Sequence, residues 1–123
     1  MLLLVIAMLT TLSSDWQYVT TSSKDVDYYV DVESIRAAGG YIQAWEKADY
    51  SKDPSTKARE AKILLDYDCS GRRNRLRASI NYDARGVVID SYTWNEYEAG
   101  WRPLAPDTVG YAKMEYTCRI AAG

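Results

Sequence analysis

The chain has 123 residues, 15 basic and 17 acidic side chains, and a formal net charge of −2. This length suits one domain with one core, and the near balance of charge excludes a dedicated nucleic-acid binder, whose surface is strongly basic. The chain contains no histidine, so the commonest general base and the commonest zinc or haem ligand are missing from its chemistry.

The chain opens with an apolar segment, residues 1–9, which small and polar residues follow up to Ser14. The segment is shorter than the roughly 20 apolar residues that cross a bilayer, and small residues after an apolar run are typical of signal cleavage sites. We therefore interpret residues 1–14 as a signal peptide or its remnant and residues 15–123 as one exported domain with no integral membrane span. An ordinary first strand is the alternative, because no basic residue precedes the apolar run.

Segments rich in aromatic and β-branched residues predict a series of strands in the first half of the domain. Residues 16–21 form the first expected strand, residues 26–32 the second and residues 41–50 the third. A short helical or 3₁₀ turn is expected at residues 33–36, and residues 51–56 have the composition of a loop.

Residues 58–68 have good helix propensity, but their strict alternation of apolar and polar side chains favours a strand. Its apolar face carries Ala61, Ile63, Leu65, Tyr67 and Cys69. The next strand repeats the pattern, with Leu76, Ala78, Ile80 and Tyr82 on its apolar face. A two-residue turn at Ser70 and Gly71 predicts the pairs Leu65 with Leu76, Ile63 with Ala78, Asp66 with Arg75, and Asp68 with Arg73.

A second hairpin is expected where residues 82–87 place aspartate at the start and glycine at the end of a type I turn. Residues 87–94 form the returning strand, with Ile89 opposite Ile80. After residues 101–106 the period changes, and Tyr111, Met114 and Cys118 recur at helical spacing behind a cap at Asp107 or Thr108. The last segment is therefore predicted to be a helix that packs on the sheet.

Cys69 ends an alternating strand and Cys118 lies on the predicted helix. In an exported chain with two cysteines, a single disulfide is the simplest pairing. A disulfide that closes a loop of about fifty residues raises the free energy of unfolding by roughly 4 kcal/mol. Two buried free thiols in a cytosolic protein are the alternative. The predicted fold class is α+β: one antiparallel meander sheet of five to six strands, with a C-terminal helix packed on one face and tied to it by the disulfide.

The sequence predicts no enzyme, no catalytic residue, no cofactor and no metal. No pair of carboxylates has a distinctive spacing, and no glycine-rich phosphate motif occurs. The acidic run at residues 25–33 lacks the glycine and the spacing of a calcium loop, so we interpret it as a strand with alternate acidic side chains in solvent.

A basic cluster at residues 72–77 is the sharpest functional candidate. The expected second hairpin places Tyr92 opposite Arg77 and Trp94 near Arg75, and arginine with tyrosine and tryptophan is the composition of binding hot spots. The candidate partner-binding residues are Arg73, Arg75, Arg77, Tyr92 and Trp94. The structural alternative is that these arginines only pair with Asp66 and Asp68 across the hairpin. The same face is also a candidate homodimer interface, or the surface on which the helix packs.

The order and spacing of a larger set of residues resemble the bacterial surface-adhesin protein E family over residues 15–119. The set is Trp16, Tyr28, Tyr29, Val30, Asp31, Ser34, Ile35, Trp45, Lys47, Tyr50, Asp68, Cys69, Tyr82, Asp83, Gly86, Pro106, Asp107 and Cys118. The resemblance implies an antiparallel sheet of about six strands with a disulfide-bridged C-terminal helix. It also implies a small exported domain that binds host extracellular-matrix proteins and can dimerise.

Two functions follow from these expectations. The first is a non-catalytic exported bacterial domain, periplasmic, surface-bound or secreted, that binds proteins or polyanions through its arginine and aromatic face. The second is a periplasmic structural or assembly protein that forms homo-oligomers through the sheet face and has no host ligand.

Overall fold

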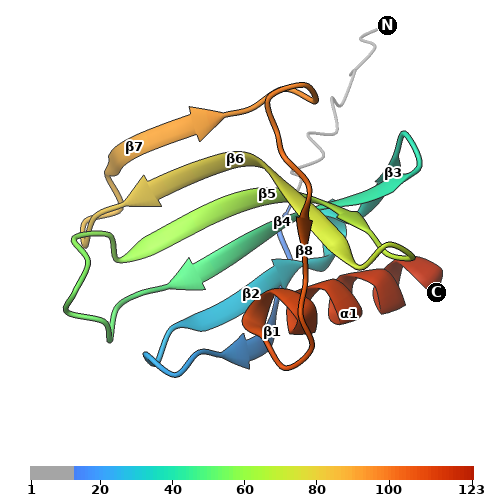
Figure 1. Cartoon of the computed structure of the whole chain (residues 1–123). Coiled ribbons are helices and arrows are strands. Elements are labelled where there is room, and N and C mark those ends of the chain that lie inside the picture. Colours follow the sequence, from blue (N-terminus) through green and yellow to red (C-terminus); the bar gives the residue numbers. More distant parts are fainter. Residues whose placement is uncertain (1–12) are drawn as a thin grey trace, which may run out of the picture.

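The computed structural model describes residues 13–123, and Figure 1 shows an antiparallel sheet with a helix against one of its faces. The predicted leader lies outside the described residues, apart from Ser13 and Ser14. The strands are β1 (Trp16–Thr21), β2 (Asp27–Asp31), β3 (Arg36–Ala38), β4 (Tyr41–Asp49), β5 (Glu60–Asp68), β6 (Arg73–Tyr82), β7 (Val88–Thr93) and β8 (Arg102–Pro103). A 3₁₀ turn, η1 (Val32–Ser34), follows β2, and the helix α1 (Val109–Ala122) is the last element.

The six long strands lie in the order β1-β2-β4-β5-β6-β7, and all neighbours are antiparallel. This arrangement confirms the predicted fold class. Two short strands were not predicted: β3 pairs with β4, and β8 pairs with β6 beyond the end of β7. Both β7 and β8 pair with β6, at different parts of its length. The loop that joins them therefore runs along this edge of the sheet.

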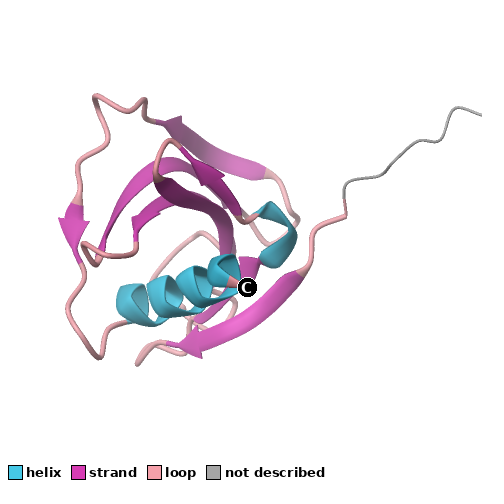
Figure 2. Cartoon of the chain, turned by 90° about the vertical axis from the view of Figure 1, so that its right-hand side faces the viewer, coloured by secondary structure: helices cyan, strands magenta, loops and turns pink. Residues whose placement is uncertain are grey.

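The core lies on the face of the sheet that α1 covers, which we call the inner face; Figure 2 shows the sheet curving around the helix. Leu65 and Tyr67 of β5 pack with Met114 of α1, and Tyr111 and Cys118 contact the same cluster. A second cluster joins strands β4 and β5 to the loop before β2, and its buried members are Val26, Ala48 and Ala61. Alternation along β5 thus places its apolar residues as predicted, and helical spacing in α1 presents Met114 and Cys118 to them.

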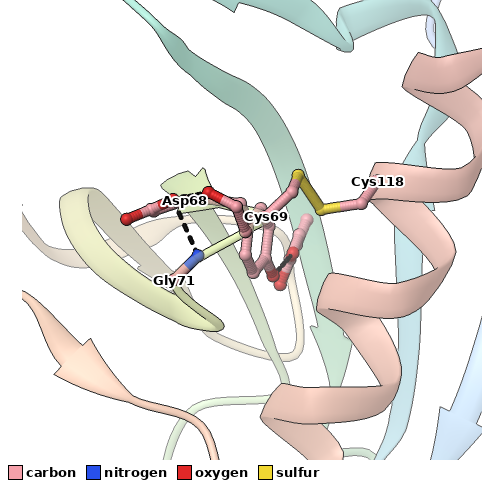
Figure 3. The surroundings of a disulfide bond; sticks show 7 residues. Asp68, Cys69, Gly71 and Cys118 are labelled. Atoms are coloured by element: carbon pink, nitrogen blue, oxygen red, sulfur yellow. Dashed lines mark hydrogen bonds between the residues drawn. A yellow bond between two sulfur atoms is a disulfide. The ribbon is translucent and has the colours of Figure 1, made fainter.

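The disulfide between Cys69 and Cys118 ties the end of β5 to α1 (Figure 3). The two residues are 49 positions apart in sequence, and their Cα atoms are 6.0 Å apart. The predicted bridge is therefore confirmed, and the free-thiol alternative is wrong. Beside it, the Gly71 N–H donates to the Asp68 carboxylate at 3.0 Å and closes the turn into β6. A side chain at position 71 would overlap that carboxylate, which explains the glycine.

A β-bulge at Arg77 reverses the faces of β6. Leu65 pairs with Leu76 as predicted, but Leu64 pairs with Ala78, so Arg77 is the extra residue of the bulge. Directly opposed residues share a face, so Ala78 lies with Leu64 on the outer face, away from α1. The predicted pairing of Ile63 with Ala78 is therefore wrong. The later apolar residues of β6, Ile80 and Tyr82, also lie on the outer face because they pair with Lys62 and Glu60.

The second hairpin contains the expected turn, but its register differs from the prediction. The Asp83 N–H donates to the Val87 carbonyl at 2.9 Å, and pairing starts only beyond this closed loop. A second irregularity then leaves Ile89 without a ladder partner, so Ile80 opposes Ser91. The predicted pairing of Ile89 with Ile80 is wrong, and every later pair in this hairpin shifts with it.

Candidate functional site

The structure separates the arginines from the aromatic residues with which they were predicted to form one patch. Tyr92 opposes Ser79, which opposes Ile63 on the inner face, so Tyr92 does not face Arg77. The Trp94 ring stacks on the Tyr92 ring with 6.0 Å between centroids and lies on the same side. Arg77 donates from Nη1 to Asp66 on the outer face and from Nε to the backbone carbonyl of Trp94 at 2.9 Å, and neither bond involves the Trp94 ring. The bulge and the shifted hairpin therefore divide the predicted patch between two faces.

Arg75 and Arg77 form a buried ion-pair network with Asp66 on the outer face. The Asp66 carboxylate accepts from Arg75 Nε at 2.9 Å, from Arg77 Nη1 at 3.0 Å and from the Gln43 amide at 3.0 Å. The side chains of Arg75 and Asp66 are only 7% and 2% exposed. The predicted pairing of Asp66 with Arg75 is confirmed, and this geometry gives both arginines a structural role.

Hydrogen bonding decides the protonation of Asp66. Burial by itself raises the pKa of this carboxyl group, but the hydrogen bonds from Arg75, Arg77 and Gln43 outweigh it and hold the pKa below its ordinary value of 3.8. The carboxylate is therefore ionised at neutral pH and offsets the charge of the guanidinium groups.

Two aromatic rings cover this network. The Arg75 guanidinium lies 4.9 Å from the ring centre of Tyr41 and 4.5 Å from that of Trp101. The Arg73 guanidinium lies 4.6 Å from the Trp101 ring and pairs with Asp68 at 2.8 Å, as predicted. Arg73 is the exposed member of the three arginines, since 42% of its side chain is open to solvent.

A cleft of about 470 Å³ opens on the inner face between β5, β6, α1 and the loop that joins β7 to β8. Its floor is apolar, and its walls contain the Trp94 indole and several polar side chains, a composition typical of small-molecule sites. The lining residues are Ile63, Leu65, Asn74, Leu76, Trp94, Glu98, Ala99, Gly100, Trp101, Arg102 and Lys113. Among the predicted site residues, Trp94 alone lines this cleft.

Lys113 of α1 reaches the sheet through a buried ion pair that the sequence did not predict. Its Nζ lies 2.7 Å from Glu46 Oε1, and the Tyr67 hydroxyl donates to the other oxygen of the same carboxylate. The Lys113 ammonium also lies 5.0 Å from the ring centre of Tyr28. Burial first and the neighbouring Glu46 second raise the pKa of Tyr67 well above its ordinary value, so its hydroxyl stays protonated.

The last strand of the sheet order, β7, exposes apolar side chains along an edge of the sheet. We call this set the β7 edge: Val87, Val88, Ile89 and Tyr92. Their exposed fractions lie between 47% and 56%, and the strand contains neither proline nor lysine, which commonly protect sheet edges. In the following loop, Tyr97 is 98% exposed. The β7 edge is thus the clearest apolar surface that the described residues offer to another molecule.

These features define a small sheet domain with a disulfide-tethered helix, an apolar edge and an aromatic cleft. Among the described residues, no helix is long and apolar enough to cross a membrane. The sequence profile described as surface-adhesin protein E matches residues 16–119. The chain therefore belongs to the surface-adhesin protein E family, and this membership makes it an adhesin-like surface protein.

Solved structures with the same fold come from Haemophilus influenzae. Crystal form II of its protein E is 20% identical, has a TM-score of 0.61, and is matched over 90% of this chain and 95% of that one. A further structure of protein E is 19% identical with a TM-score of 0.59, over 89% of this chain and 88% of that one. At these identities the likeness shows the fold alone. The search of curated proteins found no match.

Proposed function

We propose that this chain is a non-catalytic exported bacterial domain that binds a protein partner through the β7 edge. Family membership supports a binding role, and the name of the family supports a location at the cell surface. We choose this surface on one observation: the apolar side chains of β7 are exposed, and Tyr92 is 56% exposed. Exposed apolar patches with aromatic residues mark protein interaction sites.

Backbone groups at the β7 edge add a second means of recognition. The Trp94 N–H donates to the Arg77 carbonyl, so the residues that alternate with Trp94, namely Thr93 and Ser91, direct their N–H and C=O groups away from β6. An extended segment of a partner that lies alongside β7 would satisfy these groups, while Tyr92 supplies apolar contact area.

In this proposal the predicted binding residues have different roles. Tyr92 contacts the partner directly, and Trp94 supports the Tyr92 ring at 6.0 Å. Arg73 is the candidate contact for a polyanion, because its guanidinium is partly exposed and a guanidinium binds oxyanions bidentately. Arg75 and Arg77 support the sheet beneath Trp101 and Tyr41 and do not contact the partner.

The test is binding of the purified domain to an immobilised, solubilised basement-membrane matrix, measured by biolayer interferometry. Replacing Tyr92 with alanine is expected to weaken binding about tenfold or more, the usual effect of losing an interface anchor. Tyr18→Ala is the matched control, because Tyr18 is also 56% exposed but lies on β1 at the other end of the sheet. Equal losses in the two variants, or no binding by the unmodified domain, would contradict the proposal.

A second candidate function is a periplasmic structural protein that forms homo-oligomers through the outer face. A hollow of about 250 Å³ on that face, lined by residues that include Trp16, Trp45 and Ile80, favours it. Sedimentation velocity at micromolar concentration separates the two functions. A monomer at all concentrations argues against the second function, whereas a stable oligomer that Trp45→Ala dissociates supports it.

A further inference from the structure

We propose that the inner-face cleft is a binding site for a neutral saccharide of one or two rings. This inference goes beyond the proposed protein-binding function, because Tyr92 and the rest of the β7 edge do not line the cleft. The volume of about 470 Å³ lies within the range of small-molecule sites and suits a ligand of this size.

The Trp94 indole of the cleft provides the flat surface that a sugar ring requires. Trp94 lines the cleft beside a floor that includes Leu76. Flat aromatic rings pack against the C–H faces of a pyranose, which are apolar although its rim carries hydroxyl groups. The Trp94 ring stacks on the Tyr92 ring with 6.0 Å between centroids, and this contact supports its position before a ligand arrives.

Polar side chains line the same cleft as the Trp94 indole. Asn74 and Arg102 oppose each other across β6 and β8, so their side chains share a face. Among the described residues neither of these side chains makes a hydrogen bond or an ion pair. Glu98 also lines the cleft, and one of its oxygens accepts from the Asn95 N–H at 3.2 Å. An amide, a guanidinium and a carboxylate together provide the donors and acceptors that sugar hydroxyl groups need.

The charges of the cleft favour an uncharged ligand. Glu98 and Arg102 carry opposite charges, and the ammonium of Lys113 is neutralised by Glu46 at 2.7 Å. The lining therefore has no net charge to attract an apolar anion such as a fatty acid. A ligand with many hydroxyl groups uses both the donors and the acceptors, whereas a hydrocarbon chain would leave them unpaired, which is costly.

The experiment titrates the whole domain with maltose, cellobiose, lactose and N,N′-diacetylchitobiose, with octanoate as the apolar anion, and follows ligand saturation-transfer signals and tryptophan fluorescence. We expect saturable binding of at least one disaccharide and weaker or no binding of octanoate. Trp94→Ala is expected to weaken disaccharide binding about tenfold, the loss that corresponds to one good aromatic contact. Trp45→Ala is the matched control, because Trp45 lies on the outer face and does not line the cleft.

Arg102→Ala provides a second variant in case Trp94→Ala fails to fold, since Arg102 is exposed and makes no ion pair among the described residues. It should weaken disaccharide binding about fivefold, as the loss of a charged hydrogen bond does. The proposal is overturned if none of the four disaccharides saturates, if octanoate binds more tightly than all of them, or if Trp45→Ala weakens binding as much as Trp94→Ala. Arg102→Ala should leave binding to the basement-membrane matrix unchanged, because Arg102 is not part of the β7 edge. Failure of the saccharide proposal is therefore distinguishable from failure of the protein-binding proposal.

Discussion

Asp66 is the residue on which the polar part of the outer face depends. It is almost fully buried, and it accepts hydrogen bonds from two arginines and one glutamine. A buried ion pair is weak evidence of net stabilisation, but removing one partner leaves the other charge buried without compensation. The side chains around Asp66 are therefore sensitive to the loss of a single negative charge.

Replacing Asp66 with asparagine should lower the free energy of unfolding by about 3 kcal/mol, because Arg75 and Arg77 lose their counter-charge. Urea denaturation followed by circular dichroism measures this loss. Glu96→Gln is the control, since Glu96 is an exposed loop residue and its replacement should change stability by less than about 0.5 kcal/mol. Equal effects of the two substitutions would show that the network does not stabilise the fold.

Lowering the pH should remove the stabilisation that the Asp66 carboxylate provides. The folded pKa of Asp66 lies below its ordinary value of 3.8, so its stabilising effect is present above that value and is lost as the pH falls through the folded pKa. The difference in unfolding free energy between the unmodified domain and Asp66→Asn should therefore be constant above about pH 5 and shrink as the pH falls below 3.8. A difference that stays constant while the pH falls from about 5 to about 2 would contradict the assignment.

At the scale of elements, two different contacts attach α1 to the sheet. One is the disulfide at Cys118, and the other is the buried pair between Lys113 and Glu46, one helical turn or more towards the helix start. Thr108 caps the helix by accepting from the Tyr111 N–H at 3.2 Å. A covalent bond and an ion pair thus set both the position and the rotation of the helix.

Lys113→Met should destabilise the domain by about 3 kcal/mol, because Glu46 then keeps a buried charge with only the Tyr67 hydroxyl as its partner. The double variant Lys113→Met, Glu46→Gln should recover at least half of this loss, since it removes both charges. A double-mutant cycle in urea measures the coupling between the two residues. A double variant as unstable as Lys113→Met would show that packing, rather than charge, explains the cost.

Removing the disulfide by Cys69→Ala with Cys118→Ala should lower the free energy of unfolding by about 4 kcal/mol on the chain-entropy account of a loop this long. The measurement compares urea midpoints of this variant with those of the unmodified domain, with and without reductant. Reductant should lower the midpoint of the unmodified domain alone. If reductant also lowered the urea midpoint of the double variant, the effect of reductant on the unmodified domain would not come from this disulfide.

The long strands and the helix could be predicted because their alternation and helical spacing are strong local signals. The bulge at Arg77 could not, because apolar and polar residues continue to alternate through it and only the pairing with β5 reveals the extra residue. Ile89 was misplaced for a similar reason, since the length of the closed turn depends on hydrogen bonds to Asp83. The strands β3 and β8 are too short to show a period.

The candidate sites were harder to predict than the fold. Trp94 was singled out, but Trp101 and Arg102 come from a loop whose path no local pattern indicates. Lys113 was also missed, because a lysine on a helix usually faces solvent and its buried partner Glu46 lies 67 positions earlier in the chain. Contacts of this kind arise from the tertiary structure and leave no periodic signal in the sequence.

At the scale of the whole molecule, the curved sheet has an inner face that the helix covers only in part and an outer face without a helix (Figures 1 and 2). The aromatic cleft occupies the uncovered part of the inner face, and the apolar edge of β7 lies beside it. Two neighbouring surfaces of different chemistry are thus available on one small domain, which suits a protein whose function is binding.

The disulfide also has a mechanical consequence. Force applied between Asp15 and Gly123 passes from Cys69 directly to Cys118, so the intervening polypeptide with β6, β7 and β8 carries no tension. The 49-residue separation shields about 170 Å of chain from extension at the usual length per residue. A pull on the two ends of the described chain would therefore unravel β1 and β2 before it stretched the β7 edge.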